Sequence, residues 1–134
     1  MIRAGKQVSF SLVIAIFFML LPLDAALAQK GRSIVRRVNF PRNRTTTVLR
    51  GTLRRGISHD YLLRARAGQT MSVHLAAQSP EMYLTILKPG RETWMDDIKD
   101  WSGVLPLTGT YRINVIPDTT TERPKSYTLE ITIR

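Results

Sequence analysis

The chain has few residues of the types that carry out chemistry. His59 stands between Ser58 and Asp60, and the other histidine, His74, stands in an alternating stretch. A serine, a histidine and an aspartate can act as nucleophile, base and orienting acid, but such groups meet through the fold and not as three consecutive residues. The chain also has no cysteine, which excludes thiol chemistry. These residues therefore predict a protein that is not an enzyme.

The acidic segment from Asp96 to Asp100 is the other candidate for chemistry. Its carboxylates could supply oxygen ligands to a calcium ion, which takes six to eight of them from a flexible loop. The segment lacks the spacing and the glycine of an EF-hand loop, and Lys99 places a competing positive charge within it. A solvated loop is the favoured interpretation, and the sequence predicts no metal site and no cofactor.

Arginines are the strongest compositional feature, and their guanidinium groups can bind phosphate or carboxylate groups through two parallel hydrogen bonds. Nucleic acid is disfavoured as a partner because no aromatic residues alternate with these arginines, as stacking on single strands requires. A soluble basic strand face and a basic loop are the alternative to a site for an anionic surface. The residues concerned are Arg50, Arg54, Arg55, Arg64 and Arg66.

The five residues from Leu105 to Gly109, LPLTG, match the signal that sortases cut. Sorting also needs a membrane-spanning stretch and a basic tail after the motif. The residues that follow Gly109 instead alternate as a strand pattern up to Ile133. The motif therefore predicts a turn, in which Pro106 ends one strand and Tyr111 begins the next buried row.

The N-terminus has the pattern of a secretory signal peptide. Arg3 and Lys6 precede an apolar run over residues 10–23, and small residues at positions 26 and 28 suit a signal peptidase. The run is shorter than the roughly 20 apolar residues of a membrane-spanning helix. We expect cleavage before Gln29, one domain over residues 29–134 with no transmembrane span, and a periplasmic or secreted location in a bacterium.

Positive charge is concentrated in the first half of this expected domain. Residues 29–134 carry 18 basic and nine acidic residues, and the stretch from Lys30 to Arg66 has 11 of the basic residues and one acid, Asp60. Such an excess favours anionic polymers or surfaces and speeds association with acidic partners.

Short alternating runs separated by Gly, Pro, Asn and Asp predict an all-β domain. The clearest run is Ser126 to Arg134, in which apolar residues occupy every second position. About eight such strands, mostly antiparallel, predict a single-domain β-sandwich in which two sheets bury each other's apolar faces. The expected strands are residues 36–40, 46–53, 59–67, 70–76, 81–87, 102–106, 111–115 and 126–134, and residues 94–100 are expected to be irregular.

The succession VNF, RGTLRRG, DYLLRARAGQTMSVHL, LPLTGTYRINV and YTLEITIR resembles the periplasmic inhibitors of g-type lysozyme over nearly all of residues 29–134. It is similar, more loosely, to the β-sandwich domains at the C-termini of secreted bacterial pre-peptidases. The matching residues are scaffold residues, so they indicate the fold more directly than the activity.

The resemblance implies a small periplasmic β-sandwich that inserts two loops into the substrate cleft of a g-type lysozyme and catalyses nothing itself. Carried onto this sequence, the loops are residues 55–60 and 117–125. The family has tyrosines in the first loop, and the second carries paired arginines where this chain is shorter. The implied partner-binding residues are Ile57, Ser58, His59, Asp60, Glu122, Arg123 and Lys125.

Two other functions remain open at this point. An envelope-associated module could hold an anionic polymer or lipid through the arginine-rich half of the chain, and its binding would weaken as salt rises. A structural subunit could instead dock onto a partner through an exposed strand edge.

Overall fold

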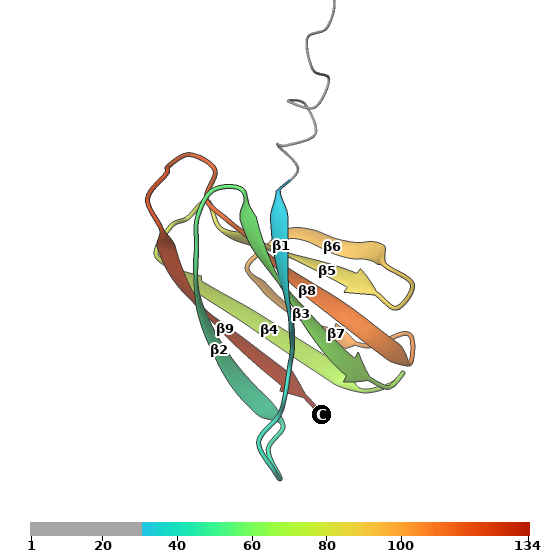
Figure 1. The fold of residues 1–134 in the computed structure, drawn as a ribbon. Coiled ribbons are helices and arrows are strands. Elements are labelled where there is room, and N and C mark those ends of the chain that lie inside the picture. The colour runs from blue at the N-terminus through green and yellow to red at the C-terminus, as the bar shows by residue number, and fades with distance from the viewer. Residues whose placement is uncertain (1–30) are drawn as a thin grey trace, which may run out of the picture.

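A computed structural model describes residues 31–134 of the protein, so the expected signal peptide and its cleavage site lie outside the described residues. The described part folds as a β-sandwich of nine strands (Figure 1), which confirms the predicted fold class. The strands are β1 (Arg32–Arg37), β2 (Thr46–Leu53), β3 (Ile57–Ala65), β4 (Thr70–Ala77), β5 (Tyr83–Lys88), β6 (Glu92–Ile98), β7 (Asp100–Val104), β8 (Gly109–Ile116) and β9 (Lys125–Ile133).

The strands form two sheets that pack face to face. One sheet has the order β1-β3-β8-β5-β6, and the other has the order β2-β9-β4-β7. Successive strands often change sheet, and β1 pairs with β3 in parallel whereas the other pairs are antiparallel. Strands β2 and β3 are joined by a short turn but belong to different sheets, so this turn bridges the two layers at one end of the sandwich.

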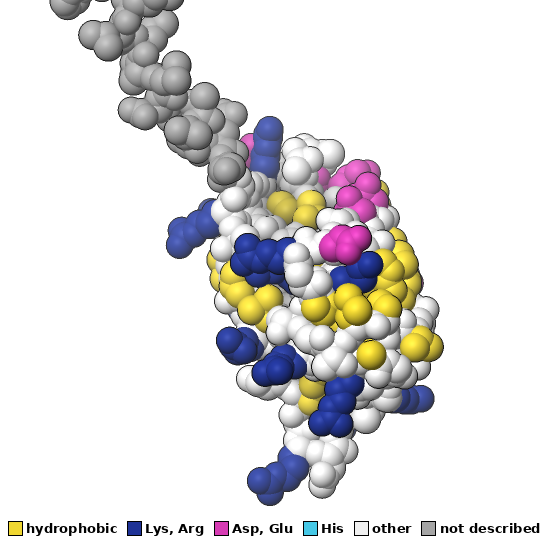
Figure 2. Space-filling model, turned by 90° about the vertical axis from the view of Figure 1, so that its right-hand side faces the viewer, with side chains coloured by type: hydrophobic (Ala, Val, Ile, Leu, Met, Phe, Trp, Pro, Cys, Tyr) yellow, Lys and Arg dark blue, Asp and Glu magenta, His cyan; other side chains and the backbone are white. Residues whose placement is uncertain are grey.

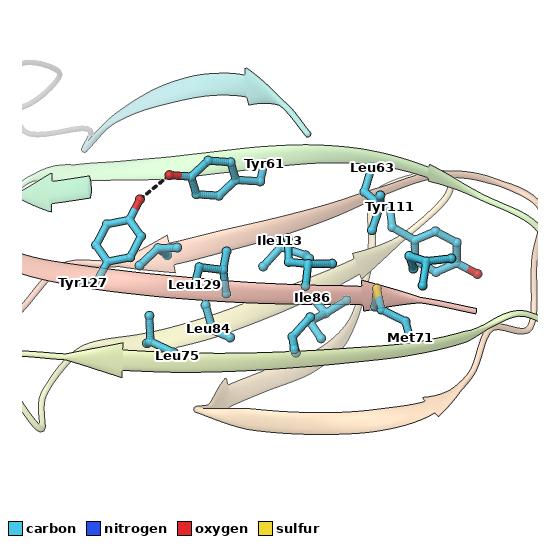
Figure 3. Close-up of a cluster of buried hydrophobic side chains, with 14 of the residues drawn as sticks. Tyr61, Leu63, Met71, Leu75, Leu84, Ile86, Tyr111, Ile113, Tyr127 and Leu129 are labelled. Carbon is cyan, nitrogen blue, oxygen red and sulfur yellow. Dashed lines mark hydrogen bonds between the residues drawn. The ribbon is translucent and has the colours of Figure 1, made fainter. Parts of the chain in front are cut away.

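The core lies between the sheets and follows from the alternation of the strands. In β3 and β9 every second side chain is buried, as it is in β4 and β8, because a sheet with one solvated face turns alternate residues inward. Figure 3 shows a row of aliphatic side chains with a tyrosine pair at one end and Tyr111 at the other. The inward sets predicted for residues 61–65, 71–75 and 127–133 are confirmed.

The prediction of an irregular segment over residues 94–100 is wrong, because β6 and β7 occupy most of it. Its alternation is broken by shifts of register in the pairing of β6 with β5, and Asp97 has a φ of 52°. Trp94 and Trp101, on β6 and β7, pack edge to face with their ring centroids 4.7 Å apart. The first strand also begins earlier than expected, at Arg32 and not at Arg36, because β1 pairs with β3 from the start of both strands.

The first four residues of the LPLTG motif form the connection between β7 and β8, as predicted for a turn, and Gly109 begins β8. Leu105 is buried, and its backbone N–H and C=O bond to Gln69 and Gly68. The Tyr111 hydroxyl donates to the Leu107 carbonyl at 2.7 Å and accepts from the Leu107 N–H at 3.1 Å. The motif thus fixes a corner of the sandwich.

Candidate partner-binding site

The turn between β2 and β3 is tight and carries two arginines. It spans residues 54–56 and is closed by a hydrogen bond of 3.0 Å from the Ile57 N–H to the Arg54 carbonyl. Gly56 has a φ of 78°, which glycine adopts at little cost and side-chain-bearing residues rarely adopt. Arg54 and Arg55 are both exposed at the tip.

The loop between β8 and β9 is longer and is held by its own polar side chains. It spans residues 117–124 between two prolines. The buried Asp118 carboxylate accepts the Thr120 N–H at 2.8 Å, and the Thr121 hydroxyl accepts the Arg123 N–H at 3.1 Å. These bonds shape the loop and leave Arg123 exposed near its end.

The two loops, called the paired loops below (residues 54–56 and 117–124), project from the same end of the sandwich (Figure 1). The Arg55 guanidinium donates to the Glu122 carboxylate at 2.9 Å and forms an ion pair with it. Segments 67 residues apart in the chain are therefore in direct contact at their tips. A protruding surface of this kind can enter a concave site on a partner.

Four residues predicted to lie in the first loop are part of a strand instead. Ile57, Ser58, His59 and Asp60 are the first four residues of β3, and His59 and Asp60 are each only 4 % exposed. The loop that the resemblance implied over residues 55–60 is therefore too long, because the turn ends at residue 56, and the alternation that predicted a strand from residue 59 places His59 and Asp60 correctly. Of the other predicted binding residues, Glu122 and Arg123 lie in the second loop, and Lys125 begins β9.

His59 is part of a buried chain of hydrogen bonds between the sheets. Its Nδ1 atom lies 2.6 Å from the hydroxyl oxygen of Tyr127, which lies 2.5 Å from that of Tyr61 (Figure 3 shows the tyrosine pair). Burial, with the charge of Arg36 as a smaller cause, holds the pKa of His59 below its usual value. Burial and the hydrogen bond with Tyr61 raise the pKa of Tyr127, so both groups are neutral near pH 7.

Asp60 points to the other side of β3 and forms a second network there. Its carboxylate accepts hydrogen bonds from the Arg112 guanidinium and from the Asn114 amide, both on β8. The Arg112 side chain is 22 % exposed. Asp60 thus ties β3 to β8, so its carboxylate is engaged within the protein.

The predicted arginine-rich half does not form a single face in the described part of the chain. Arg64 lies on the outer face of one sheet and Arg50 on that of the other. Arg54 and Arg55 precede the first residue of β3, whereas Arg66 follows its last residue at the opposite end of the strand. On the face drawn in Figure 2, Lys and Arg side chains are scattered from top to bottom, whereas Asp and Glu gather near the upper edge. The five arginines are therefore divided between two faces and two ends.

Sequence reasoning missed the residues that support the paired loops. The sequence predicts Tyr127 only as one of several inward residues of the last strand, and no sequence pattern marks Gly51. A Cβ atom on Gly51 would lie 2.6 Å from the Tyr127 hydroxyl, so only glycine leaves room for this ring. The sequence does contain a signal for the burial of His59. Alternate residues of a strand face the same side, and His59 lies two residues before the inward-facing Tyr61.

The described residues offer no group of three His, Asp or Glu side chains that could hold a metal ion. Across residues 31–134, no helix is long and apolar enough to cross a membrane.

Neither a protein-family model nor a curated protein sequence matches the chain. Solved structures, in contrast, do match the chain. PliG from Aeromonas hydrophila, a periplasmic lysozyme inhibitor of g-type lysozyme, is 25 % identical, has a TM-score of 0.68, and aligns over 77 % of this chain and 98 % of its own.

Two further PliG structures share the fold at lower identity. The Salmonella Typhimurium protein is 20 % identical with a TM-score of 0.58, over 78 % of this chain and 99 % of its own. A mutant of the Escherichia coli protein is 21 % identical with a TM-score of 0.57, over 78 % and 99 %. The resemblance seen in the sequence is confirmed, and the chain has the fold of the PliG periplasmic inhibitors of g-type lysozyme.

Proposed function

We propose that this protein is a periplasmic, non-enzymatic inhibitor of g-type lysozyme that inserts its paired loops into the substrate cleft of the enzyme. The observation that carries the proposal is the contact between Arg55 and Glu122, which joins the two loops at one end of a sandwich with the PliG fold. Two loops at opposite ends could not enter one cleft together.

The chemistry of the loop tips suits such a cleft. Glycosidases act through carboxyl groups that flank the scissile bond, and an exposed guanidinium can pair with a carboxylate through two hydrogen bonds. Arg54 is exposed in the first loop and Arg123 near the end of the second, while Arg55 is already paired with Glu122. Arg54 and Arg123 are therefore the cations available to a partner's acid.

The shape of the loops supports binding without a large rearrangement. The first loop is only three residues long and is closed by a backbone hydrogen bond, and the second is fixed by Asp118. Loops that are ordered before binding lose less conformational entropy when they bind. The smaller entropy loss compensates in part for the binding energy that aromatic anchor residues supply in other interfaces.

The test is an inhibition assay with the purified protein, expressed from its full sequence, against a g-type lysozyme and a lysozyme of another type. We expect inhibition of the g-type enzyme at close to equimolar ratio. Arg54→Ala and Arg123→Ala should each weaken it by about tenfold or more. Arg66→Ala is the matched control, because this exposed arginine lies at the other end of β3.

Full activity of several g-type lysozymes at a large molar excess of the protein would refute the proposal. Inhibition that Arg66→Ala weakens as much as Arg54→Ala would keep the function but move the binding surface away from the paired loops.

A further inference from the structure

A third loop lies at the same end of the sandwich as the paired loops. It connects β4 with β5 over residues 78–82, and Figure 1 shows it beside the loop between β8 and β9. Pro80 and Glu81 are exposed, whereas Ser79 and Met82 are buried. The third loop is thus anchored by two buried residues, and the two residues between them, Pro80 and Glu81, face outward.

Asp118 joins this third loop to the second of the paired loops. Its carboxylate accepts the Ser79 hydroxyl at 2.5 Å through one oxygen, and the Thr120 N–H at 2.8 Å and hydroxyl at 2.5 Å through the other. Both Asp118 and Ser79 are nearly inaccessible, with exposures of 6 % and 5 %. One buried carboxylate therefore connects segments 39 residues apart.

Other hydrogen bonds hold the third loop on both of its sides. The backbone N–H of Gln78 donates to the Ser126 carbonyl at 3.0 Å, and the Gln78 side-chain oxygen accepts the Ser126 N–H at 2.9 Å. The Lys99 ammonium donates to the Pro80 carbonyl at 2.7 Å. The third loop consequently has a defined position relative to the paired loops.

The charge state of Asp118 is consistent with an anchoring role. The hydrogen bonds from Ser79 and then from Thr120 hold the pKa of this carboxyl below its usual value. The carboxylate form, which can accept all of these hydrogen bonds at once, is the form present at neutral pH.

We propose that the partner-binding end consists of three loops, in which residues 78–82 make the third contact with lysozyme and Asp118 is the positioning residue that locks this loop to residues 117–124. The proposal rests on the function proposed above and extends it. It names Pro80 and Glu81 as contact residues that the resemblance did not indicate. Asp118 and Ser79 act only through the loops they hold.

The contact is tested with a label. The chain has no cysteine, so Glu81→Cys introduces a unique site for a bulky maleimide, and Arg66→Cys provides the same label at the opposite end. We expect the label at position 81 to weaken inhibition of a g-type lysozyme by about tenfold or more, and the label at position 66 to leave it unchanged. Equal inhibition by both labelled proteins would overturn the third contact.

The positioning role is tested with Ser79→Ala and Asp118→Asn, with Asp96→Ala as a control that removes another carboxylate–hydroxyl bond, to Thr85. Both test variants should weaken inhibition and should speed hydrogen exchange of the Thr120 amide by about tenfold, while exchange of the buried Ile131 amide stays slow. Faster exchange at Thr120 with undiminished inhibition would overturn the role. If the unmodified protein fails to inhibit, the proposed function fails, whereas the exchange of Thr120 still decides whether Asp118 holds the loop.

Discussion

The Nδ1 atom of His59 lies 2.6 Å from the hydroxyl oxygen of Tyr127, in a core built mainly from aliphatic side chains. His59 is the third residue of β3, and Tyr127 is the third residue of β9. The hydrogen bond therefore joins the two strands directly below the paired loops. Two contacts fix these loops relative to each other, one between His59 and Tyr127 at their roots and one between Arg55 and Glu122 at their tips.

The buried histidine should make stability depend on pH. Because the pKa of His59 is lower in the folded protein than its usual value of 6.5, the unfolded chain binds the proton more readily. Folding free energy is then lost as the pH falls below that usual value toward the lower folded pKa. Thermal melting between about pH 7.5 and 5 should show a declining midpoint. The decline should flatten in His59→Gln and persist in His74→Gln, because His74 is exposed. An unchanged slope in His59→Gln would contradict this assignment.

Removing the Tyr127 hydroxyl should destabilise the protein. Tyr127→Phe leaves the buried His59 ring and Tyr61 hydroxyl without the group that bonds to both. A buried polar group without a partner costs about 1–3 kcal/mol. Urea denaturation should report a loss of that size in the free energy of unfolding. Tyr83→Phe, at a partly exposed position on β5, should change it by about 0.5 kcal/mol at most. Equal effects of the two variants would refute the role of the network.

Gly51 should not tolerate a side chain. In Gly51→Ala the new Cβ would lie 2.6 Å from the Tyr127 hydroxyl and 2.7 Å from the ring carbon that bears it, so the tyrosine would have to move. Overpacking of this kind costs about 1–3 kcal/mol, again measured by urea denaturation. Gly31→Ala is the control, because its Cβ would meet no atom closer than 3.4 Å. A Gly51→Ala protein as stable as the unmodified one would show that the ring is free to shift.

The ion pair at the loop tips should matter for inhibition more than for stability. Its side chains are 57 % and 81 % exposed, and exposed pairs contribute about 0–1 kcal/mol. Arg55→Glu and Glu122→Arg should each leave the melting temperature nearly unchanged but weaken inhibition of a g-type lysozyme, because like charges separate the tips. The double variant restores opposite charges and should recover part of the inhibition. A double variant no better than either single one would indicate that the side chains act separately.

The fold could be predicted where strands are half-buried. In β9 the alternation of Tyr127, Leu129, Ile131 and Ile133 with polar residues marks both the strand and its inward face. The same reasoning fails for β6, where bulged pairing and the positive φ of Asp97 interrupt the alternation. The parallel pairing of β1 with β3 is decided by contacts between segments distant in the chain, which no local pattern records.

The site could be predicted only in outline. The resemblance indicated the two connections that form the paired loops, but it implied a first loop that extends to residue 60, whereas β3 begins at Ile57. The fold buries His59 and Asp60 by giving each a partner on another strand, Tyr127 on β9 and Arg112 on β8. Burial of a polar side chain depends on such partners, and they become visible only when the strands are placed side by side.

Hydrogen exchange of the protein with and without a g-type lysozyme tests the central claim most directly, because it locates the contact surface. Amides of the paired loops, such as those of Arg55 and Glu122, should exchange more slowly in the complex. Amides in the turn of residues 66–69, at the opposite end of the sandwich, should be unaffected. Protection confined to residues 66–69, or no protection anywhere at saturating lysozyme, would contradict the account.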